Sequence, residues 1–187
     1  MKNRKRMAGM ALILLLLVIA GWIAFTTIKT AMLYTIPNHQ ADIETHLIEW
    51  QKRTGDEHDL TLLTVKRLGD SDTLVAFFES EAHVWGFATL KEGSNQKLRI
   101  VESQYGDSDY SYDGVSTNHG DYAIVTARNL PEGARFGRVK LVNTSFYFPF
   151  AIPDEPILML MQKVPDGLAS YDYDEFTFYD QDYQEID

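Results

Sequence analysis

The residue pattern with the clearest chemistry is a run of alternating oxygen-bearing side chains that ends in a glycine. Asp109, Ser111 and Asp113 occupy positions 1, 3 and 5 of this run, and Gly114 occupies position 6. Calcium loops of the EF-hand type place oxygen ligands and a turn glycine at the same positions. Position 12, where those loops have a bidentate Glu, is Gly120. The spacing predicts a weak calcium site at Asp109, Ser111 and Asp113; an ordinary surface turn is the alternative.

A second group of candidate ligands falls within a predicted helix. His39, Asp42, His46 and Glu49 follow one another at spacings of 3, 4 and 3 residues, which places them on one helical face. Imidazole and carboxylate groups together can hold zinc or copper. His39 and His46 are two turns apart, however, so a shared ion would need further ligands. A solvated polar face is the favoured interpretation.

Signatures of catalysis are missing from the sequence. There is no cysteine nucleophile, and no serine lies in a Gly-x-Ser-x-Gly turn. His58 and His119 have aspartates nearby, but such pairs are common in turns. With 27 Asp and Glu residues, carboxylate pairs are too frequent to indicate a glycosidase. We therefore assign no catalytic residue and no cofactor apart from the weak calcium site.

The charge of the chain is divided unevenly. Four of the first six residues are Lys or Arg, and the first acid is Asp42. From residue 30 onward, 27 Asp and Glu stand against 12 Lys and Arg. A surface this acidic repels anionic lipid and nucleic-acid phosphates, so nucleic-acid binding is set aside. It attracts cations, and the expected partner is a basic envelope protein or peptide.

The longest apolar stretch predicts a membrane-spanning helix. Residues 7–28 form 22 positions without a charge, and a helix of that length spans about 33 Å, enough to cross a bilayer core of about 30 Å. Cations are concentrated before this segment, and Lys29 alone follows closely. The positive-inside rule then predicts a signal anchor in membrane lipid, with residues 1–6 as a cytoplasmic stub and the remainder outside the cytoplasm.

A cleaved signal peptide is the competing interpretation of this segment. Val18, Ile19 and Ala20 offer a small-residue cleavage site after a short apolar core. The apolar stretch continues through Trp22, Ile23 and Phe25, which is longer than a usual signal-peptide core and favours the anchor. Under either interpretation the rest of the chain is exported.

The exported part is predicted to begin with a stalk and a short helix. Residues 29–37 form the juxtamembrane stalk, and residues 38–54 show helical spacing of apolar side chains. The apolar stripe consists of Ile43, Leu47 and Trp50. Asn38 is the predicted N-cap, and Gly55 lies where a C-terminal glycine usually ends a helix. This amphipathic helix is expected to pack on the domain that follows.

Residues 58–187 show the alternation typical of β-strands. The candidate strands are residues 60–68, 73–79, 83–90, 97–103, 122–128, 135–142, 145–150, 157–162 and 171–179. Glycine- and aspartate-rich turns separate them, and none of the connections is long enough for a parallel crossover. The last strand is expected to carry a bulge at Asp174–Glu175, where its alternation shifts by one residue. The fold class is thus mainly β, an antiparallel β-sandwich or curled sheet.

A run in the middle of the chain is similar to a known group of proteins. It consists of VAFFE at 75–79, GFA at 86–88, KLRI at 97–100, YG at 105–106, TNHGDY at 117–122, IV at 124–125 and RNL at 128–130. Over about residues 60–145, the chain resembles small single-pass membrane-anchored proteins of Bacillus-type bacteria with an exported β domain of unknown function. The resemblance implies a location and a fold class, and no functional residue.

Location and composition together favour a non-catalytic role. The lack of cysteine suits an exported protein of a Gram-positive bacterium. We expect an interaction or sensing module of the cell envelope, anchored in the cell membrane with its C-terminal domain outside the cytoplasm. The alternatives are an envelope hydrolase that uses carboxylates and a structural domain stabilised by calcium.

Overall fold

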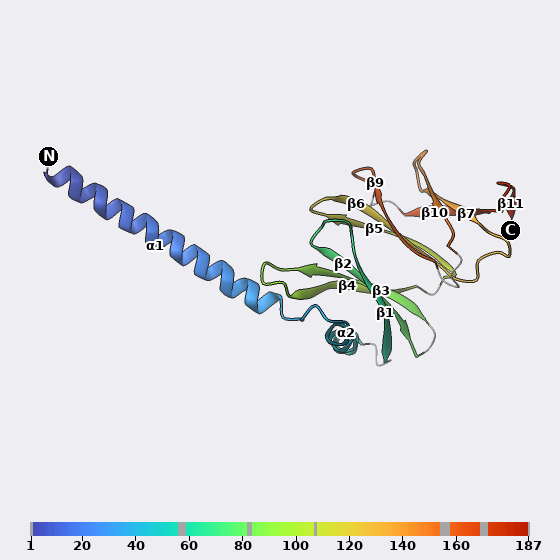
Figure 1. Ribbon diagram of the computed structural model, residues 1–187, viewed down its shortest axis with the longest axis horizontal. Coiled ribbons are helices and arrows are strands. Elements are labelled where there is room, and N and C mark those ends of the chain that lie inside the picture. The colour runs from blue at the N-terminus through green and yellow to red at the C-terminus, as the bar shows by residue number, and fades with distance from the viewer. Residues whose placement is uncertain are drawn as a thin grey trace.

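The computed structural model describes residues 2–55, 59–81, 84–106, 108–153, 158–168 and 172–186, with side chains from Ile13 onward. Within these residues, two helices precede eleven strands (Figure 1). The elements are α1 (Lys2–Leu33), α2 (Gln40–Thr54), β1 (Leu60–Arg67), β2 (Thr73–Ser80), β3 (Trp85–Glu92), β4 (Leu98–Gly106), β5 (Tyr110–Thr117), β6 (Gly120–Ala127), β7 (Phe136–Leu141), β8 (Tyr147–Ala151), β9 (Leu158–Val164), β10 (Tyr173–Tyr179) and β11 (Glu185–Ile186).

The strands form three antiparallel sheets. Sheet A has the order β1-β2-β3-β4, sheet B has β5-β6-β9, and sheet C has β11-β10-β7-β8. Every pairing of strands within these sheets is antiparallel. The predicted fold class, a mainly β domain preceded by an apolar helix and a second short helix, is confirmed. The sequence pattern did not reveal that the strands divide among three sheets.

Three apolar clusters join the layers in the order α2, sheet A, sheet B, sheet C. The first cluster packs Ile43 and Leu47 of α2 on one face of sheet A. The second joins the opposite face of sheet A to sheet B, for example Phe77 to Ile124. The third joins sheet B to sheet C. Sheets A and B are therefore covered on both faces, which explains why β2 and β6 are apolar in continuous runs rather than alternating.

Helix α1 extends away from the β domain (Figure 1). Its apolar part, Ile13–Leu33, has 21 residues and is not buried within the protein, so it is a candidate membrane span or signal segment. The helix continues past residue 28, where the predicted span ended, and includes residues 29–33 of the predicted stalk. The helix can continue to Leu33 because no Gly or Pro interrupts the chain between Gly21 and Pro37; the limits of the membrane span stay a prediction.

The rest of the predicted stalk is fastened to the domain. We call residues 34–37 the neck. Within it, the Ile36 amide donates to the Leu98 carbonyl oxygen at 3.0 Å, and the Leu98 amide donates back at 2.8 Å. The Ile36 side chain is only 4% exposed, and Asn95 Nδ2 donates to the Tyr34 carbonyl oxygen at 3.0 Å. The neck is thus a short extension of sheet A beside β4 rather than a free tether.

Helix α2 begins two residues later than predicted. Its N-cap is His39, without a side-chain hydrogen bond to the helix, and not Asn38. The C-terminal prediction is confirmed: Gly55 has a left-handed φ of 98°, and its amide donates to the Gln51 carbonyl oxygen. Ile43 and Leu47 are buried as the apolar stripe predicted.

The nine predicted strands correspond to β1–β4 and β6–β10, with shifted ends. The bulge predicted in the last of them is confirmed, because the pairing of β10 with β7 shifts between Tyr173 and Glu175. Strands β5 and β11 were not predicted. His58, His83, Ile157 and Tyr171, which belonged to predicted sites or strands, lie outside the described residues.

Two glycines allow aromatic rings to cross their strands. Gly86 of β3 lies directly opposite Phe78 of β2, and Gly137 of β7 lies directly opposite Phe150 of β8. A Cβ atom added at Gly137 would overlap the Phe150 ring, and one added at Gly86 would lie 2.5 Å from the Phe78 ring. Both phenylalanines are buried. The glycines are therefore packing positions within the strands.

Candidate functional site

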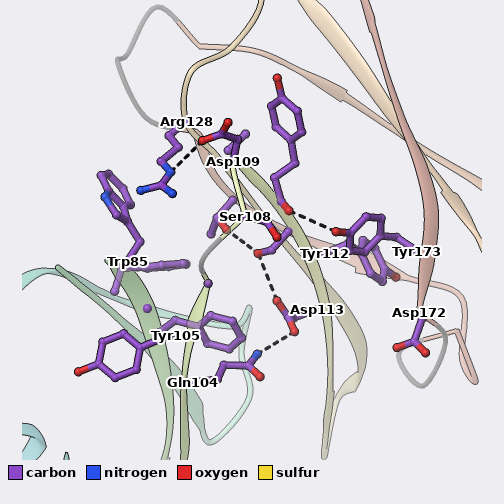
Figure 2. Close-up of a pocket in the computed structure, with 18 residues that line it drawn as sticks. Trp85, Gln104, Tyr105, Ser108, Asp109, Tyr112, Asp113, Arg128, Asp172 and Tyr173 are labelled. Atoms are coloured by element: carbon purple, nitrogen blue, oxygen red, sulfur yellow. Dashed lines mark hydrogen bonds and ion pairs between the residues drawn. The ribbon is translucent and has the colours of Figure 1, made fainter. Parts of the chain in front are cut away.

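A cavity of about 350 Å³ lies at the corner where the chain passes from sheet A to sheet B (Figure 2). The end of β4 and the start of β5 form this corner, and the segment leading into β10 contributes Asp172 and Tyr173. Two sheets joined by one short connection separate near such a corner, which leaves space between them. The lining combines aromatic rings, carboxylates and uncharged polar groups.

A chain of hydrogen bonds runs along the cavity wall around Asp113 (Figure 2). Gln104 Nε2 donates to Asp113 Oδ1 at 2.7 Å. The Ser111 hydroxyl donates to Asp113 Oδ2 at 3.3 Å and lies 2.6 Å from the Thr126 hydroxyl. Since the single Ser111 proton is directed to Asp113, Thr126 is the donor to Ser111. Side chains of β4, β5 and β6 thus fix the position of the carboxylate.

The alternation of β5 decides which of its side chains face sheet A. Tyr112 belongs to the cluster between sheets B and C, whereas Val115 belongs to the cluster between sheets A and B. Ser111 and Asp113 share the face of Val115, because side chains two residues apart point to the same side of a strand. Ser111 and Asp113 therefore face sheet A beside the cavity, whereas Val115, further along the same face, packs in the apolar cluster between sheets A and B.

The pKa of Asp113 is raised above its ordinary value of 3.8. Burial of the carboxyl group is the largest cause, and the nearby charges of Glu102 and Asp172 add to it. Hydrogen bonds from Gln104 and Ser111 act in the opposite direction. Asp113 thus has hydrogen-bond donors but several negative neighbours, an environment that favours a bound cation.

Aromatic side chains form much of the remaining wall. Trp85 and Tyr105 come from sheet A, Tyr110 and Tyr112 from β5, and Tyr173 from the start of β10. The Tyr173 hydroxyl donates to the Tyr110 carbonyl oxygen at 3.4 Å. The Tyr112 hydroxyl is buried without a hydrogen-bond partner among the described residues, and burial raises its pKa. The cavity therefore offers ring surfaces beside carboxylates.

The three predicted calcium ligands are divided between two arrangements. Asp109 Oδ1 forms an ion pair with Arg128 Nε at 3.1 Å. The same oxygen accepts a hydrogen bond from Asn129 Nδ2 at 2.9 Å. Ser111 and Asp113 are hydrogen-bonded to each other and lie on β5. The EF-hand pattern assumed a loop, but the segment is a strand, in which four residues span about 13 Å. Calcium binding by all three residues stays a prediction, and it requires the segment to rearrange.

The second predicted ligand group, on α2, does not form a metal site among the described residues. Among the side chains that the structure describes, no three His, Asp or Glu residues could hold a metal ion together. On α2, His46 Nδ1 donates to the Asp42 carbonyl oxygen at 2.8 Å. The sequence missed Trp85, Gln104 and Asp172 as site residues, because they come from separate strands and no local spacing connects them.

Comparisons with protein-family models, with curated proteins and with solved structures found no match to this chain. The resemblance to membrane-anchored Bacillus-type proteins therefore stays a prediction. The cavity at the β4–β5 corner combines space, charge and aromatic surface.

Proposed function

We propose that this protein is a membrane-anchored binding module, non-catalytic, whose β domain lies outside the cytoplasm and whose cavity accepts a cationic group. The observation that carries the proposal is the lining of the cavity, in which three carboxylates, Asp109, Asp113 and Asp172, lie among aromatic rings. Arg128 also lines the cavity, but Asp109 pairs with it. Asp113 and Asp172 then leave the cavity with an excess of negative charge.

An ammonium or guanidinium group would be stabilised here in two ways. The faces of Trp85, Tyr105 and neighbouring rings attract a cation, by about 0.5–2 kcal/mol for each well-placed pair. The Asp113 carboxylate, held by Gln104 and Ser111, would supply a charge-assisted hydrogen bond. Because Asp113 has negative neighbours in the free protein, a bound cation removes an existing repulsion. A basic side chain of an envelope protein or peptide has this chemistry.

The proposed location rests on α1. Its apolar part is long enough to cross a bilayer, and the cations gathered at its N-terminal side favour a cytoplasmic N-terminus. A domain presented on the outer side of a Gram-positive membrane would meet cationic peptides and basic proteins of the envelope. This placement also fits the acidic surface, which attracts such partners over several ångströms.

The test uses the full-length protein in lipid nanodiscs, titrated calorimetrically with Nα-acetyl-lysine amide. Nα-acetyl-norleucine amide has a similar shape without the charge and serves as the ligand control. We expect the lysine compound to bind and the norleucine compound to bind at least about tenfold more weakly, because the charge-assisted hydrogen bond and the cation–π contacts are lost.

Variants of matched charge make the test specific to the cavity. Asp113→Asn keeps the shape of the side chain and should weaken lysine-amide binding by about tenfold. Asp182→Asn removes one negative charge from the exposed turn before β11 and should leave binding unchanged. Equal weakening by both variants, or equal binding of the two compounds, would contradict the proposal.

A carboxylate-dependent hydrolase is the second candidate, and the raised pKa of Asp113 favours it. A carboxyl group with a raised pKa can act as a general acid, and Glu102 and Asp172 are the carboxyl groups whose charges act on Asp113. The two candidates differ in what Asp113→Asn does. In an enzyme, this variant would bind substrate and lose turnover, whereas in a binding module the loss is in affinity.

A further inference from the structure

A second cavity lies where α1, α2 and β4 meet, on the side of the domain from which α1 departs. Its volume is about 190 Å³. Arg53, His46 and Trp50 of α2 line it, together with Arg99 of β4 and Leu33, the last residue of α1. We call it the neck pocket, because Thr35 and Ile36 of the neck also line it.

The neck pocket differs in charge from the rest of the domain. Two arginines line it, and no Asp or Glu does. Arg53 Nε donates to the backbone carbonyl of Glu49 at 3.2 Å, and among the described residues its two terminal nitrogens have no hydrogen-bond partner. Within the same part of the chain, neither Arg53 nor Arg99 forms an ion pair.

Arg99 is fixed in place without a polar partner. Its guanidinium lies over the Tyr34 ring, 5.3 Å from the ring centroid. Its Nε atom is buried and has no hydrogen-bond partner among the described residues. The terminal nitrogens of this guanidinium are hydrogen-bond donors that an anion in the neck pocket could use.

The height of the neck pocket relative to a bilayer follows from α1. Residues 7–28 carry no charge and span about 33 Å as a helix, enough to cover a hydrocarbon core of about 30 Å. Leu33 follows five residues later, about 7.5 Å further along α1, and lines the neck pocket. The pocket therefore lies at the level of the lipid headgroups, where an aromatic residue such as Trp50 is also favoured.

We propose that the neck pocket binds the phosphate of an anionic phospholipid headgroup, with Arg53 and Arg99 as its ligands. The inference rests on the membrane anchoring proposed above. Planar guanidinium groups match phosphate oxygens and bind them through paired hydrogen bonds. His46 lies in the same lining, but its Nδ1 donates to the Asp42 carbonyl oxygen, and we do not assign it as a phosphate ligand. An acidic domain otherwise repels anionic lipid, and this pocket would hold it at one point beside the anchor.

The experiment uses the full-length chain in dodecylmaltoside micelles, with Trp22→Phe and Trp85→Phe so that Trp50 is the only tryptophan. Its fluorescence is followed during titration with dihexanoyl phosphatidylglycerol, dihexanoyl phosphatidylcholine or inorganic phosphate. We expect a saturable change with phosphatidylglycerol and at least about tenfold weaker responses with the other two ligands, since phosphatidylcholine carries a compensating cation and inorganic phosphate cannot use the micelle surface.

Charge variants identify the ligands. Arg53 is exposed, so Arg53→Gln leaves the fold intact and should weaken phosphatidylglycerol binding by about tenfold. Arg99→Gln should do the same, and Arg99→Lys should restore part of the affinity. Lys97→Gln removes a nearby exposed cation that does not line the pocket and is the matched control.

Equal responses to phosphatidylglycerol and phosphatidylcholine, or equal effects of Arg53→Gln and Lys97→Gln, would overturn the proposal. Inorganic phosphate that binds as tightly as phosphatidylglycerol would identify a soluble phosphate as the ligand and overturn the lipid source. Because binding in micelles needs no bilayer orientation, a failure of the anchoring model itself would appear separately, in the protease experiment described below.

Discussion

Asp113 is the residue on which most of the chemistry of the larger cavity depends. It accepts hydrogen bonds from Gln104 and Ser111, while Glu102 and Asp172 act on it as negative neighbours. The hydrogen bonds lower the pKa of Asp113 and the negative neighbours raise it, but burial is the largest cause and the net shift is upward. The sequence singled out Asp113 as part of a calcium loop, which stays a prediction. Its actual neighbours come from β4 and from the segment before β10, which local spacing does not connect.

The raised pKa of Asp113 predicts a specific dependence of stability on pH. The protonated carboxyl contributes stability that is fully present below the ordinary value of 3.8 and is lost as the pH rises through the raised pKa. Asp113→Asn cannot lose a proton, so its free energy of unfolding should fall less than that of the unmodified protein over this window. Thermal melts from pH 3 to pH 7 would measure the difference. Asp182→Asn is the control, and parallel pH curves for Asp113→Asn and the unmodified protein would refute this prediction.

The predicted calcium site depends on the carboxylates of Asp109 and Asp113. Calcium at ten times its Kd should raise the free energy of unfolding by about 1.4 kcal/mol, and Asp109→Asn combined with Asp113→Asn should abolish the effect. Because Arg128 pairs with Asp109, Arg128→Gln should strengthen the calcium response by removing a competitor. Melts with millimolar calcium, magnesium or chelator provide the measurement. A shift that magnesium reproduces, or that survives in the double variant, would indicate general screening and no site.

The elements of this domain were easier to predict than their partners. Alternating apolar residues and glycine-rich turns indicated nine strands, and the one-residue shift at Asp174–Glu175 indicated the bulge. Strand β5 was missed because Ser111, Asp113 and Gly114 are typical of turns. In the structure, the polar side chains among these face a polar cavity, so the strand needs no apolar residues there. Tyr110 and Tyr112 alternate with Ser111 and Asp113, and this alternation could have indicated a strand.

The strand glycines give a prediction at the level of the sheet. Gly137→Ala should lower the free energy of unfolding by about 1–3 kcal/mol, since the new methyl group overlaps the Phe150 ring in a packed core. Gly106→Ala is the matched control: it lies at the end of β4, has no left-handed φ, and has no atom within 4 Å of the added Cβ. We expect it to change stability by less than about 0.5 kcal/mol.

Chemical denaturation followed by circular dichroism would measure both glycine variants. A cost at Gly106 as large as the cost at Gly137 would show that any loss of strand glycine is harmful and that the aromatic contact is not the cause. Phe150→Leu in the Gly137→Ala background offers a further check, because a smaller side chain at position 150 should recover part of the lost stability.

As a whole, the molecule combines a long apolar helix with a layered acidic domain. The order α2, sheet A, sheet B, sheet C could not be read from the sequence, because strand patterns do not say which sheet a strand joins. The continuous apolar runs of β2 and β6 were the available signal, since strands buried on both faces lose their alternation. Each cavity takes part of its lining from a segment distant in the sequence, residues 172–173 in one and residues 99–100 in the other, so neither could be predicted from spacing.

The proposed topology makes a prediction for the intact cell. Protease added to protoplasts should degrade residues 40–187 and leave an N-terminal fragment within the membrane, because the cations before α1 favour the cytoplasmic side. An alkaline carbonate wash should not release the untreated protein. Survival of the domain would contradict the topology, and release of a shortened chain into the medium would indicate a cleaved signal peptide. Protoplasts opened before protease treatment are the control.

The paired hydrogen bonds between Ile36 and Leu98 have a mechanical consequence. A flexible stalk over residues 29–37 would have an end-to-end distance of about 15–18 Å and would let the domain turn freely. Here α1 continues to Leu33, and three residues later the chain is bound to sheet A. Any tilt of α1 is therefore passed on to the domain. Since a helix tilts further in a thinner bilayer, the thickness of the membrane would set the angle and the standoff at which the acidic cavity faces its surroundings.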